Sequence, residues 1–170
     1  MSEKFTVKKI KKHTIILFKG EDCKAVYKVL TGCLKSYIID EKGNQHIVEF
    51  AAENEIISDL NSFVNGVPSL IFIESVEDSK ILVISRLFLK NIEFLNKQDL
   101  LYALFLIAET LINANNRISK LISLGSSERY ADFVKTYPHL VQRLSQKSIA
   151  SFINVTPEYL SDIKNKANLS

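Results

Sequence analysis

Residues 146–165 read QKSIASFINVTPEYLSDIKN, and this stretch matches a helix-turn-helix pattern position by position. Ile149 and Ile153 are the apolar positions of a first short helix, and Ala150 is small where a second helix would cross it closely. Asn154 stands at the turn, because asparagine follows glycine in its tolerance of left-handed backbone geometry. The sequence therefore predicts two short helices joined by a tight turn.

The second helix of this pair carries its own start signals. Thr156 can cap it, and Pro157 then falls at the first helical position, where its missing N–H is not needed. Leu160 and Ile163 would anchor this helix to a core. Its outward residues would be Glu158, Tyr159, Ser161, Asp162 and Lys164.

A helix pair of this kind can place its second helix in the major groove of double-stranded DNA, with the N-terminus entering first. Thr, Ser and Glu side chains there can read base edges, while Lys side chains meet phosphates. The residues expected to contact DNA are Lys147, Thr156, Glu158, Tyr159, Ser161, Asp162, Lys164 and Lys166. The alternative is an amphipathic helix pair that packs without contacting DNA.

A long helix is predicted over residues 97–124, which contain no Gly or Pro and are rich in Leu, Ile and Ala. Apolar residues recur there in alternating steps of three and four, the repeat of a coiled coil. This seam consists of Leu101, Leu104, Ala108, Leu111, Asn115, Ile118 and Ile122. Its one polar member, Asn115, is the type of residue that sets register and favours two strands, so we expect a homodimer.

The same helix has a second apolar face, formed by Leu100, Ala103, Ile107, Ala114 and Leu121. Two apolar faces predict two packing partners, which we take to be a second copy of the chain and the chain's own sheet. A helix buried inside one monomer is the alternative. Gly125 is expected to end this helix, and Ser126 or Ser127 to cap a short helix over residues 128–136.

Between His13 and Ile84, short apolar runs alternate with clusters of turn residues. The runs cover residues 15–18, 25–30, 34–39, 46–50, 70–74 and 80–84. Many short strands at this spacing predict an antiparallel roll or sandwich. The expected fold is therefore α+β: an antiparallel β-roll (jelly-roll) in residues 1–96, a dimerisation helix in residues 97–125 and a helix-turn-helix domain in residues 126–170.

Composition is that of an ordinary soluble globular protein, with 170 residues, 46% hydrophobic residues, 24% charged residues and a net charge of +3. No apolar run approaches the roughly 20 residues of a membrane span. Residues 1–12 are basic and have no apolar stretch typical of a secretory signal, so we expect no membrane association and a cytoplasmic location. Residues 126–170 carry a net charge of +2, which permits nucleic-acid binding.

The sequence contains no recognisable catalytic motif or metal-ligand motif. His13, His46 and His139 are scattered without ligand spacing, and Cys23 and Cys33 fit neither a zinc site nor a CxxC pair. The sequence contains no glycine-rich phosphate loop and no nucleophile elbow. We therefore expect neither an enzyme nor a cofactor or metal site.

The order of β-roll, long helix and terminal helix-turn-helix resembles the Crp/Fnr transcription regulators over nearly the whole chain. Within that family, the run SERYADFVKTYP at 127–138, leading into QKSIASF at 146–152, is similar to the branch found in Bacteroidetes-type bacteria. The resemblance implies a homodimeric regulator that binds a pseudo-palindromic DNA site. It also adds RNA polymerase as a candidate partner.

Family members that bind cyclic nucleotides carry a Gly-Glu phosphate cassette, followed about ten residues later by an Arg that pairs with the phosphate. The matching stretch begins Ser58-Asp59-Leu60, and Ser69-Leu70 stand where the Arg is expected. A cyclic phosphate without that guanidinium loses its strongest charge-assisted contact. The resemblance thus implies a degenerate effector pocket of Ser58, Asp59, Leu60, Ser69, Leu70 and Asn115, with another small-molecule effector or none in place of cAMP.

Three further departures from the family concern the ends of the chain. Asp162 stands where the family often has an Arg that reads guanine, although a carboxylate can accept a hydrogen bond from cytosine. No β-wing is expected after the last helix. The helix that usually precedes the roll is absent or reduced to residues 4–9. These departures keep two alternatives open: a cyclic-nucleotide or small-molecule module that signals through protein partners without binding DNA, and a protein-interaction dimer with neither function.

Overall fold

The computed structural model describes residues 5–87 and 97–167, and it has an N-terminal β-roll followed by four helices. The strands are β1 (Phe5–Ile10), β2 (Ile15–Leu17), β3 (Ala25–Thr31), β4 (Leu34–Ile39), β5 (Gln45–Ala51), β6 (Ile56–Ile57), β7 (Phe72–Ser75) and β8 (Ser79–Ser85). A short helix, α1 (Leu60–Asn65), lies between β6 and β7. Each strand run expected from the sequence corresponds to a strand of the roll.

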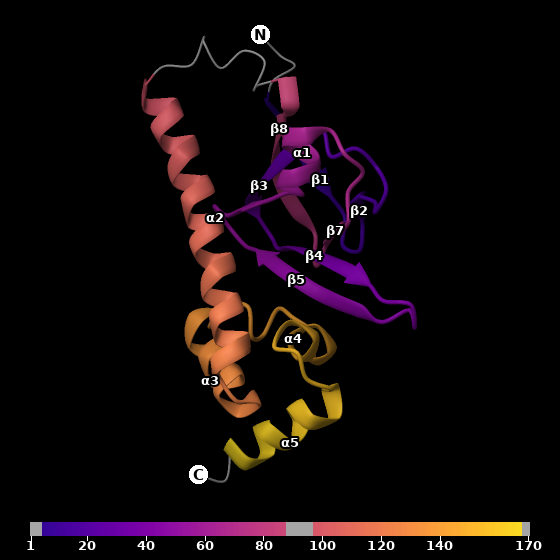
Figure 1. Ribbon diagram of the computed structural model, residues 1–170, viewed down its shortest axis with the longest axis vertical. Helices are drawn as coiled ribbons and strands as arrows, with labels where there is room; N and C mark the ends of the chain where they lie inside the picture. Colours follow the sequence, from indigo (N-terminus) through magenta and orange to yellow (C-terminus); the bar gives the residue numbers. More distant parts are fainter. Residues whose placement is uncertain (1–4, 88–96, 168–170) are drawn as a thin grey trace.

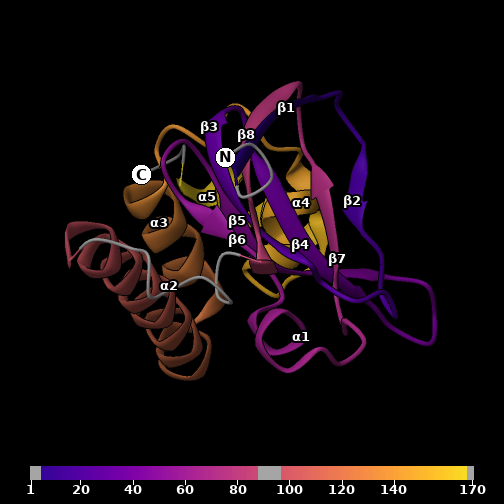
Figure 2. The same cartoon turned by 90° about the horizontal axis from the view of Figure 1, so that it is seen from above.

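Two antiparallel four-stranded sheets form the roll, in the orders β1-β8-β3-β6 and β2-β7-β4-β5 (Figures 1 and 2). Alternating apolar residues of the strands meet between the sheets, as period-two patterning requires. The buried residues of this core are Leu17, Cys23, Val29, Leu34, Ala51, Ile57, Phe63, Ile73 and Ile81. The predicted jelly-roll-like architecture followed by helices is confirmed.

The N-terminal segment differs from expectation. Residues 5–10 form strand β1, which pairs with β8 in the register Val7↔Leu82. Of the two alternatives given for the preceding helix, absent or reduced to residues 4–9, the reduced helix is therefore wrong for residues 5–9. The roll accordingly begins earlier than His13. Lys8 and Lys9 are exposed on this edge strand, and charged side chains of this kind discourage pairing with a further strand.

The helical half consists of α2 (Lys97–Ser123), α3 (Ser126–Thr136), α4 (Gln146–Phe152) and α5 (Pro157–Ala167). Figure 1 shows α2 running alongside the roll, with α3, α4 and α5 gathered at one end. No helix in the described ranges is long and apolar enough to cross a membrane.

The junction between α2 and α3 corrects a second expectation. Gly125 has φ −67°, which is not left-handed, and it is the N-cap of α3 instead of the residue that ends α2. Its N–H donates to Glu128 Oε2 at 2.7 Å, so a side chain three residues further on satisfies the free amide of the helix start. Ser126 and Ser127 therefore lie within α3 and do not cap it.

A second hydrophobic core joins the roll to the C-terminal helices. The centre of the Phe152 ring in α4 lies 5.2 Å from the ring centre of Phe50 in β5 and 5.7 Å from that of Phe133 in α3. The Arg143 guanidinium, in the segment before α4, donates to the carboxylates of Glu53 and Glu77 on the roll. The apolar core and the ion pairs together hold α3 and α4 against the roll.

Candidate functional site

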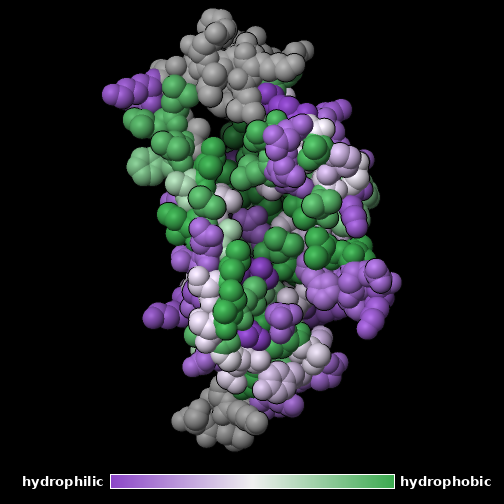
Figure 3. Space-filling model, viewed as in Figure 1, coloured by the Kyte–Doolittle hydropathy of each residue, from purple (hydrophilic) through white to green (hydrophobic). Residues whose placement is uncertain are grey.

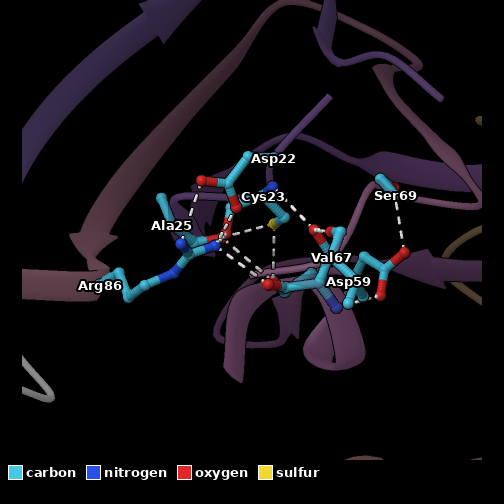
Figure 4. Close-up of polar contacts among 9 residues, drawn as sticks. Asp22, Cys23, Ala25, Asp59, Val67, Ser69 and Arg86 are labelled. Carbon is cyan, nitrogen blue, oxygen red and sulfur yellow. Dashed lines mark hydrogen bonds and ion pairs between the residues drawn. The ribbon is translucent and has the colours of Figure 1, made fainter. Parts of the chain in front are cut away.

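The stretch aligned with a phosphate cassette lies at the start of α1, where Asp59 is the N-cap. Asp59 Oδ1 accepts from Ser62 N at 3.0 Å, and Oδ2 accepts from Ser69 Oγ at 3.0 Å (Figure 4). Oδ2 also accepts from Leu70 N at 3.1 Å. Ser69 is 1% exposed. The Asp59 carboxylate thus accepts the hydrogen bonds of the Ser62 and Leu70 amides, which are the donors that a bound anion would need.

A second group of contacts fixes the other side of α1. Ser58 Oγ donates to Ala25 O at 3.0 Å and lies 3.3 Å from Cys23 Sγ. Ser62 Oγ accepts from Cys23 N at 2.9 Å. The predicted residues Ser58, Asp59 and Ser69 therefore do come together with Leu70, but in a network closed by the protein's own groups.

Arg86, just after β8, is a charged member of this network that sequence reasoning missed. Its guanidinium donates to the Asp22 carboxylate, to Cys23 O at 2.6 Å and to Ser62 O at 3.0 Å. In Figure 4 it reaches the cluster from the side opposite to Ser69. The Arg86 hydrogen bond holds the pKa of Asp22 below its ordinary value, so the charge of this guanidinium is balanced within the protein.

Asn115 does not join the network. It lies exposed on α2 and belongs to the apolar seam of that helix. The seam itself is solvent-exposed in the single chain: Leu104 is 62% exposed, Leu111 60% and Ile122 81%. Such a row of exposed large apolar side chains is unusual for a helix that has no further partner.

Only part of the second apolar face expected from the sequence meets the rest of the chain: Leu121 is half-buried and Ala114 lines a cavity beside the roll, while Leu100 and Ile107 are exposed. Leu106, Thr110 and Arg117 are half-buried on the side of α2 that turns toward the roll. Arg117 Nη2 donates to Ile47 O and to Phe152 O, each at 2.9 Å, and the guanidinium lies 4.5 Å from the centre of the Phe152 ring. A cation thus anchors α2 to β5 and α4.

A cavity of about 340 Å³ lies between β5, α2 and the C-terminal helices. Glu49, Glu55, Glu109 and Arg117 are its ionisable lining residues, together with Tyr137. Burial raises the pKa of Glu49 to about 7; the charge of Glu55 adds to this shift and Arg117 opposes it. No part of the sequence pattern pointed to this cavity, because its walls come from β5, α2 and the C-terminal helices, which lie far apart in the sequence.

The raised pKa of Glu49 makes a prediction about stability. Because the folded chain holds this proton more tightly than the unfolded chain, the folded state loses stability as pH rises from 4.5, the ordinary value, through about 7. Glu49→Gln should therefore be more stable than the wild type by about 1–2 kcal/mol at pH 8 and nearly equal to it at pH 5.

Urea unfolding at the two pH values measures this difference. Glu41→Gln is the matched control, because Glu41 is an exposed carboxylate in the β4–β5 turn. Equal stabilities of Glu49→Gln and wild type at pH 8 would contradict the prediction.

Several local features predicted for residues 146–165 are present in α4 and α5. Asn154 has φ +57° at the turn, the left-handed conformation expected of it. Ile149, Ala150 and Leu160 are at most 1% exposed. Thr156 Oγ1 accepts from Tyr159 N at 3.2 Å, which is the predicted cap of α5. The anchor positions and the turn of this helix pair are therefore confirmed.

Arg129 of α3, which the sequence analysis did not single out, holds the turn in place. Its Nε donates to Ile153 O at 2.8 Å and its Nη1 to Leu124 O at 2.8 Å. One side chain thereby ties the end of α2 to the α4–α5 turn. Its sequence separation of 24 residues from Ile153 leaves no local signal that could have revealed it.

The outward residues predicted to contact DNA lie on the accessible side of this pair. Lys147, Thr156, Glu158, Tyr159, Ser161 and Asp162 are exposed, and Lys164 is half-buried. The side chain of Lys166 lies outside the described residues. Among these, Ser161 Oγ donates to Pro157 O within α5 at 3.1 Å.

Solved structures of three bacterial proteins share this fold at low sequence identity. FixK2 from Bradyrhizobium japonicum is 19% identical, with a TM-score of 0.82 over 97% of this chain and 85% of its own. The c-di-GMP-responsive global regulator CLP from Xanthomonas campestris is 12% identical, with a TM-score of 0.76 over 97% and 87%. A Crp/Fnr-family transcriptional regulator from Thermus thermophilus is 15% identical, with a TM-score of 0.73 over 95% and 84%.

Comparison of the sequence with protein families identifies the family of the N-terminal half. None of the curated proteins matches this chain. The family model of the cyclic nucleotide-binding domain matches residues 7–93, just over half of the chain, and these residues include most of β1, all of β2 to β8, and α1. The chain therefore belongs to the cyclic nucleotide-binding domain family.

Proposed function

We propose that this protein is a homodimeric, DNA-binding transcription regulator of the Crp/Fnr type. The observation that carries the proposal is the α4–α5 pair: a buried anchor face, a left-handed turn at Asn154 and an exposed α5 face. The fold shared with a Crp/Fnr transcriptional regulator is consistent with it. A DNA partner implies a cytoplasmic location, and RNA polymerase is a further proposed partner.

The dimer part of the proposal rests on α2. Its exposed seam, Leu101 to Ile122, would pair with the same seam of a second copy, burying apolar side chains that otherwise face water. Two copies of α5 would then be related by two-fold symmetry. Such a dimer would read two half-sites about one helical turn apart, roughly 34 Å, in a pseudo-palindromic site.

The effector part of the proposal is that cAMP does not control this regulator. The Asp59 carboxylate holds the amides of Ser62 and Leu70, and Ser69 stands where a phosphate would need a guanidinium. An incoming phosphate would meet a fixed negative charge without a paired cation. The pocket is therefore degenerate toward cyclic nucleotides, and control passes to a different ligand or to none.

Titration with cyclic nucleotides tests the effector proposal. We expect cAMP and cGMP to bind no more tightly than about 1 mM, because a charge-assisted phosphate contact is replaced by repulsion. Isothermal titration calorimetry on the full chain measures both, with 5′-AMP as a control for non-specific nucleotide binding. Micromolar affinity for either cyclic nucleotide would contradict the degenerate pocket.

A protein-partner module is the second candidate, and the two exposed carboxylates of α5 favour it. Glu158 and Asp162 both lie exposed there and repel phosphate. In this alternative, the module binds a small molecule and signals through protein partners without contacting DNA.

The deciding experiment is a binding-site selection from random duplexes, followed by fluorescence anisotropy on the selected duplex and a scrambled one across a salt series. The regulator proposal expects the selected duplex to bind at least roughly 10³-fold more tightly than the scrambled one. If neither duplex binds at low salt, the proposal fails and the protein-partner module replaces it.

A further inference from the structure

Side chains of the helical half cover the free edge of strand β5. Among the described strands, β5 lies at the end of the order β2-β7-β4-β5, so only one of its edges pairs with another strand. On the other edge, Ser151 Oγ of α4 accepts from Ile47 N and donates to Gln45 O, both at 2.9 Å. Arg117 of α2 donates to Ile47 O at 2.9 Å. These side chains thus satisfy backbone groups that an open sheet edge would leave unpaired.

One hydrophobic core spans the roll and the helical half at this junction. Its buried members from the roll are Cys33, Tyr37, Ile47, Phe50 and Ala52, and those from the helical half are Phe133, Leu140, Leu144, Ile149, Ala150, Phe152, Ile153 and Leu160. Figure 3 shows mainly pale and hydrophilic side chains on the outside of the end formed by α3, α4 and α5. Separating these helices from the roll would expose the shared core to water, which the hydrophobic effect opposes.

Arg143 adds a network of ion pairs to the junction. Its Nη1 and Nη2 donate to the two carboxylate oxygens of Glu53 at 3.0 and 2.9 Å, and its Nε donates to Glu77 Oε1 at 3.1 Å. A bidentate pair of this kind fixes orientation as well as supplying energy. The hydrogen bond from Arg143 is the main cause that lowers the pKa of Glu53 to about 2, so this pair persists at neutral pH. The guanidinium thereby ties the segment before α4 to two loops of the roll.

The docked helix pair presents its other side to solvent. α4 packs against β5, whereas α5 packs against α3 and α4. Glu158, Tyr159 and Asp162 of α5 and Lys147 of α4 are exposed in this arrangement. A contact that blocked DNA binding would instead cover some of these residues. The junction with the roll therefore leaves the proposed DNA-contacting face open.

The same helix pair is also held to α2. Arg129 donates to Ile153 O, at the turn before α5, and to Leu124 O, at the end of α2, both at 2.8 Å. The position of α5 is thus fixed relative to the roll and relative to the proposed dimerisation helix. A site that is fixed before binding loses less conformational freedom when its partner binds.

We propose that the arrangement with α4 docked on β5 is the one that binds DNA, and that Arg143 is the residue that positions the helix pair for it. No ligand is then needed to release or rotate α4 and α5, and DNA binding by the folded dimer is constitutive. This inference rests on the proposed DNA function and adds how that function is regulated.

A cross-link across the junction tests whether the docked arrangement binds DNA. In the double variant Glu53→Cys/Arg143→Cys, a short bismaleimide joins the two introduced thiols. In the matched control, N-ethylmaleimide caps the same thiols without joining them. The native Cys23 and Cys33 are fully buried and should not react. Mass spectrometry identifies the two products.

The cross-linked protein should bind the selected duplex at least as tightly as the capped protein, and within about threefold of the wild type, because it is held in the competent state. Fluorescence anisotropy measures all three. Binding by the cross-linked protein that is roughly tenfold weaker than that of the capped protein would show that the helices must leave the roll, and would overturn the proposal. If the wild type binds and the cross-linked protein does not, this inference alone fails. If the wild type binds neither duplex, the regulator proposal fails and this inference with it.

Reversing the charges at the junction tests the positioning role of Arg143. Arg143→Glu places three carboxylates together, and Glu53→Lys/Glu77→Lys places three cations together. Each change should weaken binding to the selected duplex about tenfold, because like charges repel across the junction. The triple variant that combines them restores opposite charges and should recover the wild-type affinity to within about threefold.

The recovery separates positioning from a general effect of charge on DNA binding. Glu53→Lys/Glu77→Lys adds positive charge, which by itself strengthens binding to phosphate, and yet it should weaken binding here. Lys135→Glu, at an exposed position of α3, controls for the charge change in Arg143→Glu and should have the smaller effect. Unchanged affinity in both reversed variants, or no recovery in the triple variant, with circular dichroism showing them folded, contradicts the role of Arg143.

Discussion

Replacing Leu111 with glutamate is expected to convert the proposed dimer into monomers. Leu111 lies in the middle of the α2 seam and is 60% exposed in the single chain, so the change leaves the fold of each chain intact. In the dimer, two carboxylates would be buried against each other across the symmetry axis. Leaving such charges unpaired costs about 3–5 kcal/mol, a factor of about 10²–10⁴ in the dissociation constant.

Sedimentation velocity at micromolar concentration measures this change directly. Asn116→Glu is the matched control, because Asn116 is exposed on the same helix and lies outside the seam. The control should remain dimeric. A Leu111→Glu protein that sediments as a dimer would place the interface on another surface and remove the two-fold arrangement on which the DNA proposal depends.

The parts of the fold that could be predicted from sequence are those set by local chemistry. The apolar runs between Ile15 and Ile84 became strands because alternation and turn residues act over a few positions. The absence of Gly and Pro over residues 97–123 sufficed for α2. Asn154 was identifiable because few residues tolerate left-handed geometry.

The contacts that hold these elements together could not be predicted, because they join distant residues through long arginine side chains. Arg86 reaches Asp22 across 64 positions, and Arg143 reaches Glu53 across 90. Neither arginine belongs to a motif. Their roles depend on the positions that the completed roll gives to carbonyls and carboxylates, and sequence spacing does not encode these positions.

The candidate sites likewise include one that local sequence predicts and one that depends on contacts between distant residues. The anchor and cap of α5 followed from local pattern, whereas the Glu49 cavity depends on how α2 lies against β5. A rotation of α2 about its axis would present Leu100 and Ile107 to the roll in place of Leu106 and Arg117. Periodicity reveals that a helix has apolar faces, and tertiary packing decides which face meets which neighbour.

The second large effect is expected in DNA binding, where one residue of α5 should set the affinity for any duplex and another the preference for a particular sequence. Lys164→Ala should weaken binding to selected and scrambled duplexes alike, because a lysine that meets phosphate contributes without regard to sequence. The slope of log K against log salt should become shallower by about one unit. Anisotropy across a salt series measures the slope, and Lys9→Ala, on the exposed edge strand β1, is the control that should leave it unchanged.

Glu158→Ala should act on specificity instead. Glu158 is exposed in the first turn of α5. In the proposed complex this end of α5 would enter the major groove, where a carboxylate can accept from a cytosine amino group. Its loss should cost roughly 1–3 kcal/mol on the selected duplex and change the preferred base at one position of each half-site. On the scrambled duplex, removing a negative charge should strengthen binding slightly. A variant that weakens both duplexes equally would show that Glu158 supports the helix and reads no base.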